Sequence, residues 1–541
     1  MVSMTIPLIL RKHWPWLAAV ASGVLLTLCF APWNLPVLVW FALLPLIAAL
    51  WWRESETEGY AFWKAPALGY LSGFIFFAST FQWLASLADL FENPVLNGLS
   101  LYLAAYLAVY PALWAWFISR PPLPGSSAMA TSYYNVTFAL QGASAWVLLD
   151  WVRGWLFTGF GWNSPGVALH NDLALIQIVD LVGVHGVTFV VVFCNLILAL
   201  AFRRIRLEAS IRALPNLRGE FMTLLVMLGL CVSYGIRCVL KKPVSPSFSL
   251  RTVAVQPNIP QDEKFDPSDE DAALKKLDRL MQLVEGLQPL PDLVLWPEAA
   301  TPRGMFADAE SFKFTRGQVE RSGAPLLLGS LEPATSEPDG TGAFFEYNSA
   351  VLLEGNNAPP QSYRKRHLVP FGEFLPFRDW LPNWVRVLVP GDLRAGDEAN
   401  LLFLKKPAVR IGALICFEDS LAQEARSLVK EGAQLLVNLT NDSWFSTSAA
   451  AAQHLANAKF RAVELRLPLL RCANTGVTCS VDSLGRVEQR LASFTEGIDT
   501  LVVRIPKNPE FTWYAKYGDS WLWLCVAGVL MGLSRRLRRA G

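Results

Sequence analysis

Eight long apolar runs restrict what this sequence can fold into. An α-helix needs about 17–25 predominantly apolar residues to cross the hydrocarbon core of a bilayer. Most of the runs have that length, and the last is shorter and ends in the basic sequence SRRLRR. They therefore predict a polytopic α-helical membrane bundle of about eight spans. The runs lie at 14–31, 35–52, 65–85, 98–118, 132–150, 178–202, 220–240 and 519–534.

The composition agrees with a membrane location. Hydrophobic residues make up 53% of the 541 residues, and a soluble chain would need an implausibly large core to bury them. The sequence contains 21 tryptophans, whose indole rings favour the membrane interface. Because the net charge is only +2, bulk charge gives no reason to expect a nucleic-acid partner. The bilayer itself is the expected partner.

Lysine and arginine alternate between the loops, which predicts an orientation. Cytoplasmic loops are enriched in both residues. With the N-terminus inside and the first run kept as a helix rather than cleaved as a signal peptide, the loops 32–34 and 86–97 face outward and carry neither. The long segment 243–510 then lies outside the cytoplasm. The predicted cytoplasmic residues are Arg11, Lys12, Arg53, Lys64, Arg120, Arg203, Arg204, Arg206, Arg212, Arg218, Arg535, Arg536, Arg538 and Arg539.

The segment 243–510 has a different pattern, in which short runs rich in Val, Ile and Leu alternate with amphipathic stretches. Such alternation predicts an α/β domain. We therefore expect a bundle at 1–242, an α/β domain at 243–510 and a terminal helix within 511–541. The expected strands are 250–256, 292–296, 325–330, 346–353, 409–416, 434–440, 468–473, 477–482 and 500–504, and the expected helices are 269–286, 308–321, 420–431 and 449–466.

One cysteine of this domain ends an apolar strand, in RIGALICFEDS. A strand that turns into a helix at Cys416 places the sulfur near the new helix's N-terminus, which favours a thiolate. The N–H of Phe417 is placed to help bind an oxyanion. A buried structural cysteine is the commoner fate of an isolated Cys in an apolar strand. Seen alone, the segment leaves both interpretations open.

Two further segments place ionisable residues at strand edges. In LVLWPEAA, Glu298 follows a buried strand, where a carboxylate could act as general base or be merely solvated. In SYRKRHLVPFGEFLP, Lys365 could stabilise a thiolate and an oxyanion, with Glu373 holding it or orienting an amine. The alternatives are a solvated basic turn and a surface ion pair.

Taken together, the order Glu298, Lys365, Cys416 within WPE, YRKRHLVPFGE and ICFE resembles the carbon–nitrogen hydrolase (nitrilase) superfamily. The resemblance covers roughly 250–504. It implies an αββα sandwich and a Glu–Lys–Cys catalytic triad.

With the apolar runs, the chain further resembles the apolipoprotein N-acyltransferase family. That resemblance implies transfer of an acyl chain from a phospholipid donor, through a Cys416 thioester, to the N-terminal α-amine of a diacylglyceryl-modified lipoprotein. It also implies a bacterial inner membrane, with the catalytic domain on the periplasmic side. The additional matching stretches are RGWLFTGFGW (153–162), VQPNIPQDEKFDP (255–267), NLTNDSWF (438–445) and RAVELRLPLLRCANTGVT (461–478).

The resemblance also suggests supporting residues. Arg153 could pair with a lipid phosphate and Trp162 could line the acyl entry, although both could equally be interfacial anchors. Phe265 and Phe417 stand where the family often has Trp and Tyr, so substrate positioning could differ. His454 is interpreted as a structural histidine. The supporting and substrate-binding candidates are Glu373, Glu418, Phe417, Trp162, Arg153 and Phe265.

Two other functions compete with this hypothesis. A membrane-anchored amidase or nitrilase hydrolase would share the triad and pass the acyl group to water. A transporter or scaffold with an inactive head would need ionisable or broken segments in mid-membrane, and the first four runs show little of that. We expect no cofactor and no metal site, because the sequence has no paired CxxC motifs and only five histidines. Whether Cys472 and Cys479 form a disulfide stays open.

Overall fold

The computed structural model describes residues 8–51, 63–207, 217–241, 247–264, 269–334, 346–355, 358–381, 386, 392–489 and 491–538. The chain divides into two compact units. Unit 1 comprises Met1–Ala85, Val95–Val239 and Asp519–Gly541, and unit 2 comprises Ser86–Pro94 and Leu240–Gly518. The short segment Ser86–Pro94 lies between two helices of unit 1 in the sequence but packs with unit 2.

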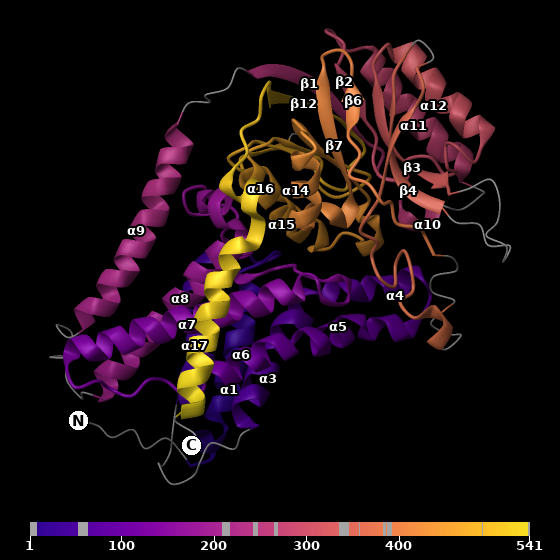
Figure 1. Cartoon of the computed structure of the whole chain (residues 1–541). Coiled ribbons are helices and arrows are strands. Elements are labelled where there is room, and N and C mark those ends of the chain that lie inside the picture. The colour runs from indigo at the N-terminus through magenta and orange to yellow at the C-terminus, as the bar shows by residue number, and fades with distance from the viewer. Residues whose placement is uncertain are drawn as a thin grey trace. The chain divides into compact units, whose positions relative to one another are not determined.

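Unit 1 is helical, and each of the eight apolar runs falls on a helical segment (Figure 1). Short 3₁₀ turns such as η1 (Pro36–Trp40) connect or extend the helices. The α-helices are α1 (Leu8–Leu28), α2 (Leu44–Trp51), α3 (Lys64–Thr80), α5 (Leu99–Leu107), α6 (Val109–Ile118), α7 (Ala128–Arg153), α8 (Val179–Leu207), α9 (Arg218–Leu240) and α17 (Leu522–Arg538).

Only some of these helices meet the length and composition of a membrane span. Three described segments do: Pro94–Ile118, Leu175–Leu207 and Arg218–Leu240. A fourth results if Lys64–Thr80 and Gln82–Leu90, which are bent by 58°, count as one span. The predicted number of about eight spans is therefore not confirmed. The remaining helices are short, as α2 is, or carry polar residues, as α7 does.

Small residues let the helices of unit 1 approach closely. A Cβ on Gly69 of α3 would lie 2.5 Å from the Pro111 carbonyl oxygen of α6. A Cβ on Gly23 of α1 would lie 2.6 Å from the Ser72 carbonyl oxygen of α3. In a bilayer, where burial of apolar surface does not drive helices together, such close backbone contact is a main source of association energy. These glycines therefore set the spacing of α1, α3 and α6.

A buried ion pair joins α7, α8 and α9. Arg204 donates to Glu220 at 3.0 Å, and the two side chains are 6% and 0% exposed. Ser132 and Asn135 of α7 also donate to the Glu220 carboxylate. Buried charges are tolerated only when they are paired and hydrogen-bonded. The Glu220 carboxylate is therefore the common acceptor that ties these three helices together.

The described residues of unit 2 form two six-stranded sheets. Within each sheet the central strands run parallel and the outer ones antiparallel. The first sheet has the order β12 (Gly497–Pro506), β1 (Ser247–Gln256), β2 (Leu293–Leu295), β3 (Leu326–Pro333), β4 (Glu346–Leu353), β5 (Gln361–Arg364). The second has the order β11 (Val487–Glu488), β10 (Cys479–Val481), β9 (Leu469–Ala473), β8 (Leu435–Thr440), β7 (Val409–Ile415), β6 (Leu402–Leu404).

The two sheets pack face to face with helices outside them. On β1, Leu250 and Ala254 join the core shared by both sheets, whereas Val253 and Val255 pack on the opposite face. This separation follows from the two-residue period of a strand. Figure 1 shows α11 (Glu270–Glu285) and α12 (Ala309–Ser322) beside the first sheet. Residues of α14 (Ala422–Lys430) and α15 (Ala450–Leu465) pack against the second.

The expected α/β fold of this region is confirmed. All nine expected strands and all four expected helices occur, with small differences at their ends. The short strands β5, β6 and β11 were not expected. Each has at most four residues, too few for an alternating pattern to stand out.

Replacing Glu220 with leucine should destabilise unit 1. The change leaves the Arg204 guanidinium buried without its carboxylate, which costs about 3–5 kcal/mol. We expect a clearly lower melting temperature for the detergent-solubilised protein. As a control, Glu270→Gln breaks an exposed pair with Arg303 and should cost less than about 1 kcal/mol. Equal melting temperatures for both variants would contradict the bracing role of Glu220.

Candidate active site

The backbone turns sharply at Cys416, directly after β7. Cys416 has a φ of +51°, a left-handed conformation that side chains with a Cβ rarely adopt. The amide of Asn438 on β8 donates to the Cys416 carbonyl oxygen at 2.8 Å. The strained conformation is thus held by the neighbouring strand, as is common at functional sites. The chain continues from Cys416 as a 3₁₀ turn, η9 (Cys416–Ser420), and α14 begins only at Ala422.

The sulfur is a thiol at neutral pH. Burial raises the pKa of Cys416 to about 11, and the Glu298 carboxylate adds to the rise. The charges of Lys365 and His454 lower this pKa without cancelling the effect of burial. The prediction of a thiolate stabilised by a helix N-terminus is therefore wrong for the resting site, because the short η9 turn provides no long helix dipole. A base must take the proton when the sulfur attacks.

Glu298 supplies a carboxylate suited to that task. It follows β2, is 7% exposed, and accepts a 2.7 Å hydrogen bond on Oε1 from Asn348. Its second oxygen, Oε2, is buried and has no hydrogen-bond partner among the described residues. Burial raises the pKa of Glu298, an effect that the Lys365 charge partly offsets. A carboxylate with a raised pKa and a vacant oxygen can act as a general base near neutral pH.

A glycine makes room for Glu298. A Cβ on Gly329 of β3 would lie 2.5 Å from the Glu298 Cα. The Gly329 N–H also donates to the Pro297 carbonyl oxygen at 3.1 Å. Directly after Glu298, Ala299 has a φ of +44°. The first sheet thus holds the Glu298 backbone in an unusual turn that any larger residue at position 329 would displace.

Lys365 follows β5 and is almost completely buried, with 1% of its side chain exposed. Its ammonium donates to Glu373 Oε1 at 2.8 Å. Asn348 also donates to Glu373, at 3.2 Å, so one amide contacts the carboxylates of both Glu298 and Glu373. Burial alone would lower the pKa of Lys365, but the charges of Glu373 and Glu298 outweigh it and raise that pKa. Lys365 is therefore a permanent cation beside the sulfur.

Glu418 connects the cysteine turn to the lysine loop. Its buried carboxylate accepts from the N–H groups of Ile415, Arg366 and His367 at 2.8–3.1 Å. The Tyr363 hydroxyl donates to it as well, at 3.1 Å. Burial raises the pKa of Glu418 to about 7, while the Lys365 charge and the backbone donors limit the rise. The carboxylate thus connects the end of β7 in the second sheet to the loop after β5 in the first.

The remaining supporting residues differ in their surroundings. The Phe417 ring lies 6.1 Å from the His367 ring, and Phe265 falls outside the described residues. In unit 1, Trp162 is buried and packs against Trp83 and Phe160, at centroid distances of 5.6 and 5.8 Å.

The predicted role of Arg153 is corrected by its contacts. Its side chain is 3% exposed, pairs with Asp150 and donates to the carbonyl oxygens of Phe160 and Trp162 at 2.9 Å. The guanidinium is engaged in holding its own loop, so neither a lipid phosphate nor an interfacial position suits it. The prediction failed because the acceptors are the Asp150 carboxylate and backbone carbonyl groups, and a sequence motif does not reveal that together they satisfy the guanidinium.

Lys264 is a functional candidate that the sequence analysis did not single out. It closes the short helix α10 (Gln261–Lys264), is 2% exposed, and donates to the Glu298 carbonyl oxygen at 2.8 Å. Burial lowers the pKa of Lys264 to about 8, and the Glu298 and Cys416 charges oppose that decrease. It is thus a second cation that acts on both the base and the sulfur. Lys264 belongs to the family-like stretch 255–267 and directly precedes Phe265, so the same motif could have identified it.

A buried ionic cluster also lies near the sulfur. His454 contacts Asp419 through Nε2 at 2.8 Å and Asp442 through Nδ1 at 2.9 Å. Arg471 pairs with Asp419 from β9. Burial lowers the pKa of His454, but Asp442 reverses this and the net pKa is raised. His454 thus connects η9 to the turn η10 (Asp442–Phe445).

An aromatic pair brings Ser86–Pro94 against the η10 turn. The Phe91 ring stacks on the Trp444 ring at a centroid distance of 6.1 Å. Trp444 belongs to the NLTNDSWF stretch. A segment far away in the sequence thus packs on the turn after β8.

The described residues contain no group of three or more His, Cys, Asp or Glu side chains that could hold a metal ion. All eight cysteines are described and are free thiols. The Cys472 sulfur points toward the carbonyl oxygens of Val255 and Leu295 on the first sheet. Cys479 pairs in register with Arg471, not with Cys472.

Replacing Lys365 with methionine should slow alkylation of Cys416. Because the Lys365 charge lowers the pKa of the thiol, its removal decreases the thiolate fraction, about tenfold for each pKa unit. We expect iodoacetamide to label Cys416 roughly tenfold more slowly between pH 7 and 9, as followed by peptide mass spectrometry. Lys275→Met, at an exposed position of α11, is the control. An unchanged rate in Lys365→Met would mean that its charge does not reach the sulfur.

Comparison with known proteins agrees with both units. Residues 22–197 match the apolipoprotein N-acyltransferase N-terminal domain, and residues 252–508 match carbon-nitrogen hydrolase. The apolipoprotein N-acyltransferase of Geobacter metallireducens is 34% identical over 97% of this chain and 95% of its own length. Those of Methylococcus capsulatus and Rickettsia prowazekii are 32% and 30% identical over 97% and 87% of this chain, and over 97% and 88% of their own lengths.

These relatives span nearly the whole chain, including its apolar helices. The chain is accordingly a membrane protein with a nitrilase-like domain. It belongs to the apolipoprotein N-acyltransferase family, acyltransferases of the carbon–nitrogen hydrolase superfamily.

Proposed function

We propose that Cys416 takes an acyl chain from a phospholipid as a thioester and passes it to the N-terminal α-amine of a diacylglyceryl-modified apolipoprotein. One observation carries the assignment of the residues. A buried carboxylate oxygen of Glu298 has no partner among the described residues, and Glu298 and the cation Lys365 both act electrostatically on the Cys416 sulfur. This combination of base, cation and nucleophile suits acyl transfer.

In the first step the sulfur attacks the ester carbonyl carbon of the phospholipid. Glu298 Oε2 accepts the thiol proton, which is necessary because the pKa of the thiol is about 11. Negative charge develops on the carbonyl oxygen, and the Lys365 ammonium stabilises it. The carbon–oxygen bond then breaks, Glu298 returns its proton to the departing hydroxyl of the lysophospholipid, and the acyl chain remains on sulfur.

In the second step the α-amine of the lipoprotein attacks the thioester. Glu298 accepts a proton from the amine and gives it to the departing sulfur, so the site returns to its resting state. A thiolate is a better leaving group than an alkoxide toward an amine, which makes a thioester a suitable intermediate. Lys365 again stabilises the oxyanion.

The supporting residues act on this geometry. Glu373 holds the Lys365 ammonium at 2.8 Å, and Glu418 holds the backbone of both loops. We assign the Phe417 ring to an apolar surface near the acyl chain, with the Phe417 N–H as a further oxyanion donor. Both substrates carry acyl chains, which accounts for an enzyme anchored by apolar helices. We place it in a bacterial inner membrane with about eight spans and a periplasmic catalytic domain.

Hydrolysis by an anchored amidase would use the same triad and differs only in the acceptor. The family relationship favours the acyltransferase. An assay that supplies phospholipid with and without a diacylglyceryl lipopeptide distinguishes the two activities. N-acylated peptide is the expected product, and free fatty acid without N-acylated peptide would establish hydrolysis.

Incubation with phospholipid alone should leave one acyl chain on Cys416. Intact-protein mass spectrometry should show one added acyl mass that hydroxylamine removes, and peptide mapping should locate it at residue 416. The Cys416→Ala variant should gain no mass. Cys472→Ala, which removes another buried thiol of the same domain, is the matched control and should still be acylated. Acylation of Cys416→Ala would refute the proposed nucleophile.

The acidic limb of the acylation rate should move when Lys264 loses its charge. Glu298 must be ionised to accept the thiol proton, so acylation falls as the pH drops through its raised pKa. The Lys264 charge lowers that pKa, and Lys264→Met should therefore shift the limb to higher pH. The measurement is the single-turnover acylation rate between pH 4.5 and 8, with Lys275→Met as control. A uniform loss of rate without a shift would indicate a purely structural role.

A further inference from the structure

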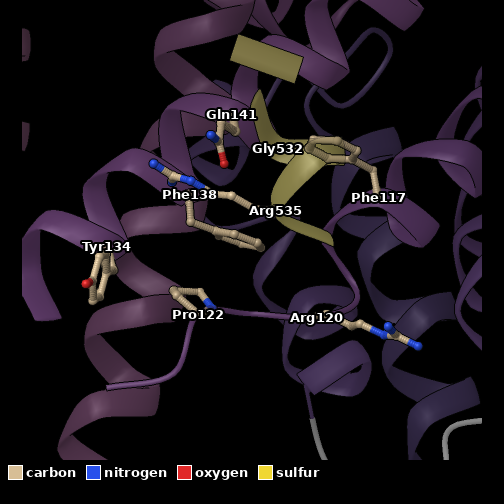
Figure 2. A pocket seen from close by; sticks show the side chains of 8 residues that line it. All are labelled: Phe117, Arg120, Pro122, Tyr134, Phe138, Gln141, Gly532 and Arg535. Atoms are coloured by element: carbon tan, nitrogen blue, oxygen red, sulfur yellow. The ribbon is translucent and has the colours of Figure 1, made fainter. Parts of the chain in front are cut away.

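A cavity of about 260 Å³ lies in unit 1 among α6, α7 and α17 (Figure 2). Its lining combines aromatic rings, among them Phe117 and Phe138, with the arginines Arg120 and Arg535 and the amide of Gln141. All of these residues belong to unit 1, whereas the candidate active site lies in unit 2. The cavity thus shares no lining residue with the candidate active site.

Gln141 is the polar group that most needs explanation. It lies in the middle of α7 and is 5% exposed. Its side-chain nitrogen, Nε2, is buried and has no hydrogen-bond partner among the described residues. A buried donor left without an acceptor is energetically costly. Gln141 lines the cavity with its amide end, whose Oε1 is turned toward Gly532. A 180° turn of the amide leaves its shape unchanged and directs Nε2 to the same place, where a ligand atom can accept its hydrogen bond.

Gly532 of α17 keeps this space open. A Cβ at position 532 would lie 2.8 Å from the Phe117 ring and 3.3 Å from Gln141 Oε1. A larger residue would therefore push against both walls and fill the cavity next to the glutamine.

Two cations border the cavity. Arg120 follows the end of α6 and Arg535 lies in the last turn of α17, and both are exposed. Neither forms an ion pair or a hydrogen bond with the part of the chain that the structure describes. In Figure 2 the Arg535 side chain lies on the Gln141 side of the cavity, whereas the Arg120 guanidinium points outward on the opposite side. A guanidinium next to an amide donor is a typical phosphate-binding combination.

We propose that this cavity binds the headgroup of an anionic phospholipid. Its phosphate accepts hydrogen bonds from Gln141 Nε2 and from Arg535, and Arg120 adds positive charge at the rim. One acyl chain lies against Phe117 and Phe138. The apolar half of the lining favours a lipid over free phosphate, because inorganic phosphate would have to be dehydrated against aromatic rings without any gain in apolar burial. The lipid would connect α17 to α6 and α7.

The test is native mass spectrometry of the full-length protein in detergent, titrated with phosphatidylglycerol or with phosphatidylethanolamine of the same acyl chains. We expect one more phosphatidylglycerol than phosphatidylethanolamine to bind tightly. Arg535→Gln and Gln141→Leu should each weaken that binding about tenfold, the loss of one charge-assisted hydrogen bond. Arg218→Gln, which removes an exposed charge from the same unit outside the cavity, should leave it unchanged.

Further comparisons separate the remaining outcomes. Equal binding of both lipids, or equal losses in Arg218→Gln and Arg535→Gln, would overturn the proposal in favour of general attraction to a charged surface. Inorganic phosphate that displaces the bound lipid at low millimolar concentration would identify a site for soluble anions instead. Gly532→Leu fills the cavity without changing any charge and should abolish the extra lipid. Thermal unfolding of each variant identifies any that do not fold, and Arg120→Gln provides a second charge variant at the rim.

Discussion

A buried lysine ammonium organises the candidate active site. Lys365 is held out of water by the fold, and burial alone would lower its pKa. The carboxylates of Glu373 and Glu298 keep it charged, and Asn348 donates to both of them. The ammonium and the carboxylates stabilise one another, because a charge in a region of low dielectric constant needs an opposite charge nearby. The neutral thiol of Cys416 can enter this arrangement, and the vacant oxygen of Glu298 can accept its proton.

The rest of unit 2 holds these charged groups in place. Cys416 follows β7 of the second sheet, whereas Glu298 and Lys365 follow β2 and β5 of the first, so the site exists only when the two sheets pack together. Glu418 joins the sheets by accepting N–H groups from both the cysteine turn and the lysine loop. On the other side, His454 lies between two aspartates and ties the cysteine turn to the turn after β8.

Unit 1 follows the same rule for charge in an apolar environment. Arg204 and Glu220 neutralise each other among three helices, and Arg153 is satisfied by Asp150 and by carbonyl groups of its own loop. Gln141 differs, since its amide nitrogen lines a cavity and has no partner among the described residues. In both units, a buried polar group without a hydrogen-bond partner indicates a site for chemistry or for a ligand. A buried ion pair whose groups are all hydrogen-bonded indicates a structural role.

The sequence by itself determined the α/β nature of the second unit and the order of Glu298, Lys365 and Cys416, because strand periodicity and short motifs are local properties. It also located the apolar helices, of which three described segments, or four if a bent pair counts as one span, have the length and composition of a membrane span. Only the tertiary structure revealed Lys264 beside Glu298, the closed bonding of Arg153 and the protonated state of Cys416. Each of these features depends on burial and on contacts with backbone groups or with residues distant in sequence. Burial and contacts of this kind set the local electrostatics, and a local sequence pattern does not contain them.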